Sequence, residues 1–102
     1  MKQPNQFKEI KQLIEELLFI LQKYGTSSYN PQKGIINEMI NIINSNYAEP
    51  QKDKILRFKY KQLFFPKSPL SEFYVWPDNP LEREKINTSL ENIKVGLWEL
   101  LG

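Results

Sequence analysis

The chain has 102 residues, with 14 basic and 12 acidic side chains, a net charge of +2, and neither histidine nor cysteine. The missing imidazole and thiol exclude Ser-His-Asp and Cys-His catalysis, disulfides and the usual zinc ligands. We therefore expect a single domain over residues 1–102 that is not an enzyme and that holds no metal and no cofactor.

The first predicted element is an amphipathic helix over residues 5–24. Its apolar side chains recur at intervals of three and four residues, which is the spacing of one helix face. They are Phe7, Ile10, Ile14, Leu17, Leu21 and Tyr24. Gly25 follows directly, and we expect it to end the helix in the left-handed conformation that glycine adopts without strain.

Proline marks the start of each predicted helix. The steps Gln3-Pro4, Asn30-Pro31, Glu49-Pro50 and Asn79-Pro80 each precede an apolar pattern with helical spacing. Proline favours an extended conformation in the residue before it, which suits an N-cap, and its missing N–H costs nothing in the first helical turn. The sequence therefore predicts an all-α bundle of about four helices.

The second and third helices are predicted over residues 33–46 and 50–64. The second is rich in isoleucine, with Ile36, Met39 and Ile43 on one face. Within the third, residues 55–61 also alternate between apolar and basic side chains, as a half-buried strand does. Helix and strand both stay open there, and the Glu49-Pro50 step favours the helix.

Residues 70–76 form a predicted extended segment between the third and fourth helices. The flanking Pro66, Pro69 and Pro77 exclude a continuous helix across this region. We interpret most of its large side chains as core. The alternative is that Tyr74 and Trp76 point outward as anchors for a partner.

The last helix is predicted over residues 80–101. Asn79 and Glu82 have the spacing of a capping box at its start. Ile86, Leu90, Ile93 and Leu97 form its apolar stripe. Trp98 lies at the edge of that stripe. We expect it in the core, and the alternative is an exposed position as an anchor for a partner.

The charges are unevenly distributed: residues 48–67 carry six basic and two acidic side chains, and residues 68–102 are net acidic. Aromatic residues alternate with the cations, so one interpretation is a nucleic-acid-binding segment over residues 52–67. The other is an amphipathic helix with a solvated lysine face, which the small net charge favours. The candidate partner contacts are Lys52, Arg57, Lys59, Lys61, Lys67, Glu72, Tyr74 and Trp76.

Three stretches of the sequence resemble a family of small helical bacterial proteins associated with immunity functions in polymorphic-toxin systems. They are Lys23-Tyr24-Gly25 at the end of the first helix, the aromatic run Pro69 to Trp76, and a final helix that carries Asn87 and closes with Leu97-Trp98-Glu99-Leu100-Leu101. The resemblance implies a protein that binds one cognate toxin at about one-to-one stoichiometry and occludes its active site. The resemblance assigns no catalytic residues to this chain.

No apolar run approaches the roughly 20 residues that span a bilayer, and the polar N-terminus lacks the pattern of a secretion signal. We therefore expect a cytoplasmic protein with no membrane partner. We expect one protein partner and no small-molecule substrate.

Overall fold

Four α-helices and one short 3-10 turn make up the described part of the chain, which in this computed structural model comprises residues 5–64 and 79–102. The elements are α1 (Asn5–Tyr24), η1 (Ser27–Tyr29), α2 (Asn30–Ile43), α3 (Glu49–Phe64) and α4 (Pro80–Leu101). These two ranges contain no strand, which confirms the predicted all-α class. The predicted extended segment 70–76 and the Gln3-Pro4 step lie outside the described residues.

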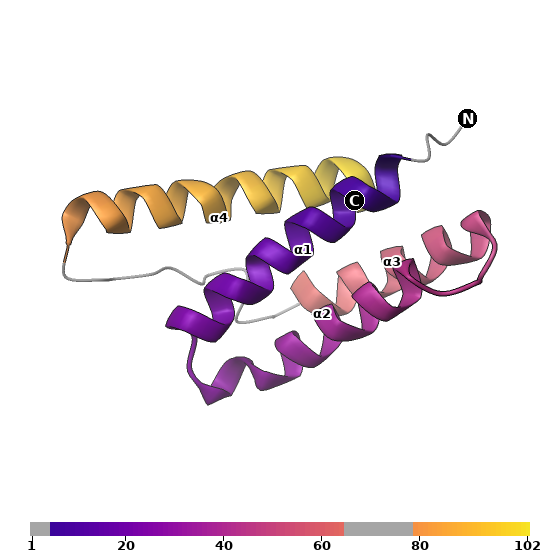
Figure 1. The fold of residues 1–102 in the computed structure, drawn as a ribbon, viewed down its shortest axis with the longest axis horizontal. Helices are drawn as coiled ribbons and strands as arrows, with labels where there is room; N and C mark the ends of the chain where they lie inside the picture. The colour runs from indigo at the N-terminus through magenta and orange to yellow at the C-terminus, as the bar shows by residue number, and fades with distance from the viewer. Residues whose placement is uncertain (1–4, 65–78) are drawn as a thin grey trace.

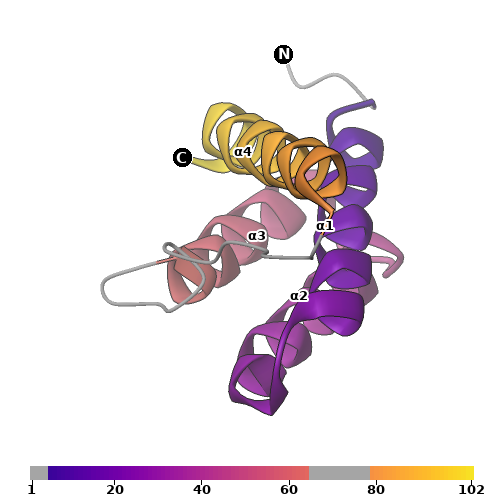
Figure 2. The same ribbon diagram turned by 90° about the vertical axis from the view of Figure 1, so that its left-hand side faces the viewer.

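The helices form a ring of four packed pairs. α1 packs against α2 and α4, α2 packs against α3, and α3 closes the ring against α4. Figure 2 shows this arrangement, with α4 above, α1 on the right, α2 below and α3 on the left. In Figure 1, α3 and α4 run in opposite directions. The α3–α4 contact is the least extensive of the four, so this side of the bundle is the most open.

The core consists of the apolar stripes that the periodicity predicts. α1 contributes the largest share, six of the sixteen buried apolar side chains among the described residues. A fully buried side chain of leucine or isoleucine gains about 1.5–3 kcal/mol from leaving water. The side chains with essentially no exposed surface are Ile10, Ile14, Leu17, Leu21, Ile36, Met39, Leu56, Leu63, Leu90, Ile93 and Leu97.

The α1–α4 contact is close because one position on α4 has no side chain. A Cβ atom at Gly96 would lie 2.9 Å from Cδ1 of Leu13. The glycine therefore lets the two longest helices approach, and Leu13 fills the space that a larger residue at position 96 would need.

The second helix lies three residues earlier than predicted, at Asn30–Ile43 instead of 33–46. It begins early because η1 leads straight into it: Asn30 has φ −57° and ψ −40°, which are helical values. The expected extended conformation before Pro31 is therefore wrong at this step. The helix ends early because the Ser45 hydroxyl donates to the Ile42 carbonyl at 2.6 Å and satisfies one of its last acceptors.

The third helix includes residues 55–61, so the strand alternative is wrong. Leu56, Tyr60, Leu63 and Phe64 are buried, at spacings of four, three and one. That spacing belongs to one helix face, whereas a strand would have buried every second residue. The apparent alternation arises because Phe58 is exposed among lysines.

Gly25, directly after α1, does not adopt the left-handed conformation, so that expectation is wrong. Its N–H donates to the Leu21 carbonyl at 2.8 Å, and a Cβ at this position would lie 2.6 Å from that same oxygen.

At the start of α4, Asn79 has the extended conformation expected before proline, and its side-chain oxygen accepts from the N–H groups of Leu81 and Glu82. The predicted N-cap is confirmed.

Candidate partner-binding groove

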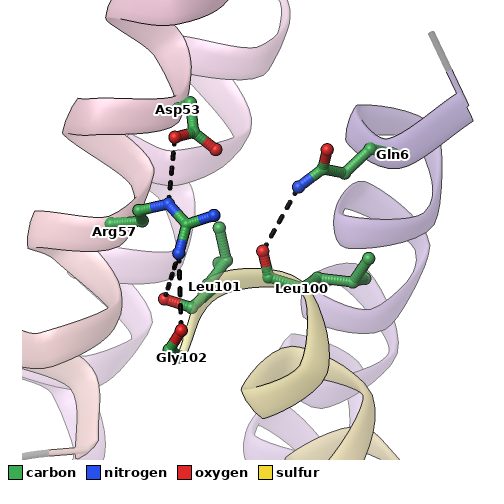
Figure 3. A network of polar contacts seen from close by, with 6 residues as sticks. All are labelled: Gln6, Asp53, Arg57, Leu100, Leu101 and Gly102. Atoms are coloured by element: carbon green, nitrogen blue, oxygen red, sulfur yellow. Dashed lines mark hydrogen bonds and ion pairs between the residues drawn. The ribbon is translucent and has the colours of Figure 1, made fainter. Parts of the chain in front are cut away.

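Arg57, one of the predicted partner contacts, ties α3 to the C-terminal turn of α4. Its Nε donates to Oδ2 of Asp53 at 2.9 Å, and its Nη1 lies 3.3 Å from the Leu101 carbonyl oxygen and 3.4 Å from that of Gly102. The last carbonyls of a helix have no intrahelical donors, so a cation there is favourable. On the opposite side, the Gln6 side chain of α1 donates to the Leu100 carbonyl (Figure 3).

Lys52 and Lys59 also make intramolecular contacts. The Lys52 ammonium donates to the Ile43 carbonyl at the end of α2, at 2.8 Å, and lies 5.9 Å from the centre of the Phe7 ring. The Lys59 ammonium pairs with Glu38 of α2 at 2.6 Å. Both lysines therefore hold α3 to its neighbours, and the periodicity of α3 alone could not reveal these partners.

Lys61 is the one described member of the predicted contacts that projects from the open side of α3. It is exposed and lines a groove between α3 and α4. Lys67, Glu72, Tyr74 and Trp76 lie outside the described residues. The four described cations thus divide into three that bridge helices and one that lines the groove.

The groove has two aromatic walls and an apolar floor. Phe58 of α3 and Trp98 of α4 form the walls, with 61% and 59% of their surfaces exposed, and the buried Tyr60 and Leu101 lie beneath them. Lys61, Gln62 and Gly102 complete its lining, and its volume is about 530 Å³. Sites of this volume typically enclose a substantial part of a ligand or of a partner side chain.

Trp98 is exposed, so the expectation that it belongs to the core is wrong. The buried residues of α4 are Leu90, Ile93, Leu97 and Leu101. Trp98 follows Leu97 by one residue, which rotates it about 100° away from that stripe. The candidate partner contacts did not include Phe58, which was considered only as a base-stacking residue, or Trp98, for which the core was favoured. Their position outside the buried stripes is the signal that could have added them.

Two tyrosines among the described residues have pKa values above the ordinary one. Burial raises the pKa of the Tyr60 phenol, which lines the groove. The Tyr24 hydroxyl of α1 donates to the Glu82 carboxylate of α4 at 2.5 Å, and this hydrogen bond raises the pKa of Tyr24. Over residues 5–64 and 79–102 no three acidic side chains gather as metal ligands would. What the groove offers is apolar contact beside a cation.

The described residues form an all-α bundle with a groove between α3 and α4 that exposed aromatic side chains line. Comparison with known protein families, with characterised proteins and with solved structures yields no match. Within the described ranges, none of the helices combines the length and the apolar character needed to cross a bilayer.

Proposed function

We propose that this chain is a non-catalytic protein-binding module, and specifically an immunity-type inhibitor that binds one bacterial toxin at one-to-one stoichiometry. The observation that carries the proposal is the α3–α4 groove with its exposed aromatic walls, Phe58 and Trp98. Large aromatic side chains beside a pocket are typical of the residues that contribute most to protein–protein affinity. Such a protein acts by covering a surface of its partner, for which it needs no catalytic group.

The inhibitor class comes from the family resemblance. Two of its three stretches lie in the described residues, and both take part in the packing around α4. Tyr24 of the first stretch bonds to Glu82 of α4, and Trp98 of the last one lines the groove. The cytoplasm, where we expect the chain, is also the compartment in which an inhibitor of this kind would meet its toxin.

The charge beside the groove favours a partner with acidic groups at its contact surface. Lys54 and Lys61 are exposed on the same face of α3 as Phe58. Charge complementarity of this kind speeds association and selects among partners more than it adds affinity. A toxin with an acidic cleft, or with an apolar surface bordered by acids, would suit this face.

The alternative, a nucleic-acid-binding segment over residues 52–67, has less support. Lys52, Arg57 and Lys59 already donate to carbonyl or carboxylate oxygens of the chain itself. Contacts to phosphate need several free cations in a row and give a steep dependence on salt. A fluorescence anisotropy titration with single-stranded and duplex oligonucleotides at low salt tests this alternative, and measurable binding there would revive it.

The test of the main proposal is to read the open reading frame next to this chain's gene, where we expect a toxin-like protein, and to co-express its product with the chain. We expect the chain to restore growth and to form a one-to-one complex by size-exclusion chromatography with light scattering. Phe58→Ala and Trp98→Ala should each raise the Kd by about tenfold or more, the effect of losing about 1.4 kcal/mol at an aromatic contact. Phe19→Ala is the matched control, because Phe19 is 62% exposed on α1 and does not line this groove.

Three outcomes would contradict the proposal. Growth that stays inhibited despite normal expression of the chain would argue against inhibition. If Phe19→Ala and Trp98→Ala lose the same affinity, the toxin does not bind specifically at the α3–α4 groove. Rescue without any complex would replace stoichiometric binding by another mechanism.

A further inference from the structure

A groove between α1 and α4 forms a second surface of the bundle. Phe19 of α1 lines it with 62% of its own surface exposed, and the buried Ile20 and half-buried Ile86 line it beside the ring. The volume of this groove is about 290 Å³, and none of its lining residues lines the α3–α4 groove. Phe19 therefore stands beside an apolar groove that it does not fill.

Two contacts fix how the two helices lie along this groove. α1 and α4 run in opposite directions (Figure 1). Tyr24 at the end of α1 bonds to Glu82 in the first turn of α4, and Leu13 lies against Gly96 near the other end. The last turns of α1 therefore lie beside the first turns of α4.

The charges beside Phe19 are of opposite sign on its two sides. Glu15 and Glu16 precede Phe19, whereas Lys23 follows it by four residues. Lys85 lies in the early part of α4 and therefore at the level of Lys23. Among the described residues, neither Glu16 nor Lys85 has an ion-pair partner, although both line the groove. The surface is thus acidic before Phe19 and basic after it.

This order of charges is complementary to itself. Consider a two-fold axis through Phe19 that lies in the plane of the surface and is perpendicular to α1. The axis lays the α1 helices of two copies antiparallel and brings the two phenylalanines together over the apolar lining. Glu15 of each copy then faces Lys23 of the other, and Glu16, on the α4 side, faces Lys85. The same axis repeats both pairs, as an isologous interface requires.

The remaining charged groups on this surface meet no like charge in that arrangement. Lys8 and Glu9 lie over residues 26–30 of the second copy, which carry no charge. Glu82 faces the amide of Gln12. The other charged side chains of the two helices lie on their sides toward α2 or α3, or in the last turn of α4: Lys11, Arg83, Glu84, Glu91, Lys94 and Glu99.

We propose that the α1–α4 surface binds a second copy of this chain, in a two-fold dimer centred on Phe19. The charges select this centre. An axis one turn earlier sets the carboxylates of Glu15 and Glu16 against their copies, and an axis one turn later sets Lys23 against Lys23. An aromatic side chain buries about 150–250 Å², so a pair of them with the groove lining gives a small interface of the reversible kind.

The dimer does not rest on the proposed function, because it concerns the isolated chain and a different groove. The α3–α4 groove stays open on each copy, so a dimer that binds two toxins keeps the one-to-one ratio.

The experiment is sedimentation velocity of the purified full chain from about 1 μM to about 1 mM, the range that covers weak dimers. We expect a concentration-dependent monomer–dimer equilibrium, in which Phe19→Ala raises the dimer Kd about tenfold or more. Glu16→Lys and Lys85→Glu should each weaken the dimer. The double variant Glu16→Lys with Lys85→Glu should restore it, because the pair is then reversed and intact.

The controls make the same kinds of change away from this surface. Glu99→Lys, in the last turn of α4, matches the charge change of Glu16→Lys and should leave the dimer unchanged. Tyr47→Ala removes an aromatic ring that is 46% exposed between α2 and α3, and it should also leave the dimer unchanged. Circular dichroism of every variant checks that it folds; if Phe19→Ala does not fold, the three charge variants still test the interface.

Three results overturn the proposal: a chain that stays monomeric throughout the range, a dimer that Phe19→Ala does not weaken, and single reversals that the double variant does not rescue. A chain that binds the toxin but stays monomeric up to about 1 mM overturns the dimer alone. A dimer that binds no toxin overturns the proposed function alone.

Discussion

Replacing Arg57 by methionine tests whether this cation, which sequence analysis assigned to a partner, holds α3 and α4 together. Methionine keeps most of the aliphatic stem and removes the guanidinium. The variant loses the ion pair with Asp53 and the contacts with the carbonyl oxygens of Leu101 and Gly102. The matched control is Lys54→Met, the same kind of change at an exposed position of the same helix.

The expected loss of stability follows from the exposure of these groups. The Arg57 side chain is 41% exposed, so its ion pair counts as a surface pair of about 0.3–0.5 kcal/mol. The two carbonyl contacts are long and share one nitrogen, so they count as a single hydrogen bond of about 0.5–1 kcal/mol. The total is about 1 kcal/mol.

Urea unfolding followed by circular dichroism measures this difference directly. For a domain of this size, about 1 kcal/mol corresponds to a fall in Tm of about 4–8 °C. Lys54→Met should change the free energy of unfolding by less than about 0.5 kcal/mol. If Arg57→Met is as stable as Lys54→Met, then Arg57 does not join the helices and its assignment as a partner contact regains support.

Three further predictions concern the core, the N-cap of α4 and the link between α1 and α4. Leu97→Ala should cost about 2–5 kcal/mol in urea unfolding, because it leaves a cavity, whereas Val95→Ala, on the exposed face of the same helix, should cost far less. Asn79→Ala should cost about 0.5–2 kcal/mol, because two N–H groups lose their acceptor. The hydrogen bond to Glu82 raises the pKa of Tyr24 in the folded chain, so its stabilisation is complete below the unfolded pKa and is lost as pH rises through the folded value. Ultraviolet titration of the tyrosines should therefore show that Glu82→Gln lowers the pKa of Tyr24.

Each of these three has a result that contradicts it. Equal losses from Leu97→Ala and Val95→Ala would mean that α4 buries a different face. An Asn79→Ala variant as stable as the wild type would mean that other groups cap the helix. A Tyr24 titration curve unchanged by Glu82→Gln would show that the hydrogen bond does not form in solution.

The sequence was sufficient where the signals are local. Proline next to a polar cap, followed by an apolar stripe, predicted the bounds of α3 and α4 to within one residue, and the spacing in α1 predicted its bounds as observed. The early end of α2 was missed because it depends on the Ser45 hydroxyl, which bonds the Ile42 carbonyl and which the apolar spacing does not reveal. The bond from Lys52 to the Ile43 carbonyl comes from another helix, and no local pattern predicts it.

The groove was missed for a related reason. Helical periodicity identifies the middle of a buried stripe well and its edges poorly. Whether an edge residue such as Trp98 or Phe58 is covered depends on the neighbouring helix, and α3 and α4 meet over only a short stretch. The basic residues were found by composition, but composition does not distinguish a lysine that bonds a neighbouring helix from one that faces solvent.

The contacts of Lys52 and Arg57 with main-chain oxygens have a consequence for behaviour in acid. A peptide carbonyl does not take up a proton when the solution is acidified. The cationic caps at the ends of α2 and α4 therefore do not depend on the protonation state of their acceptors.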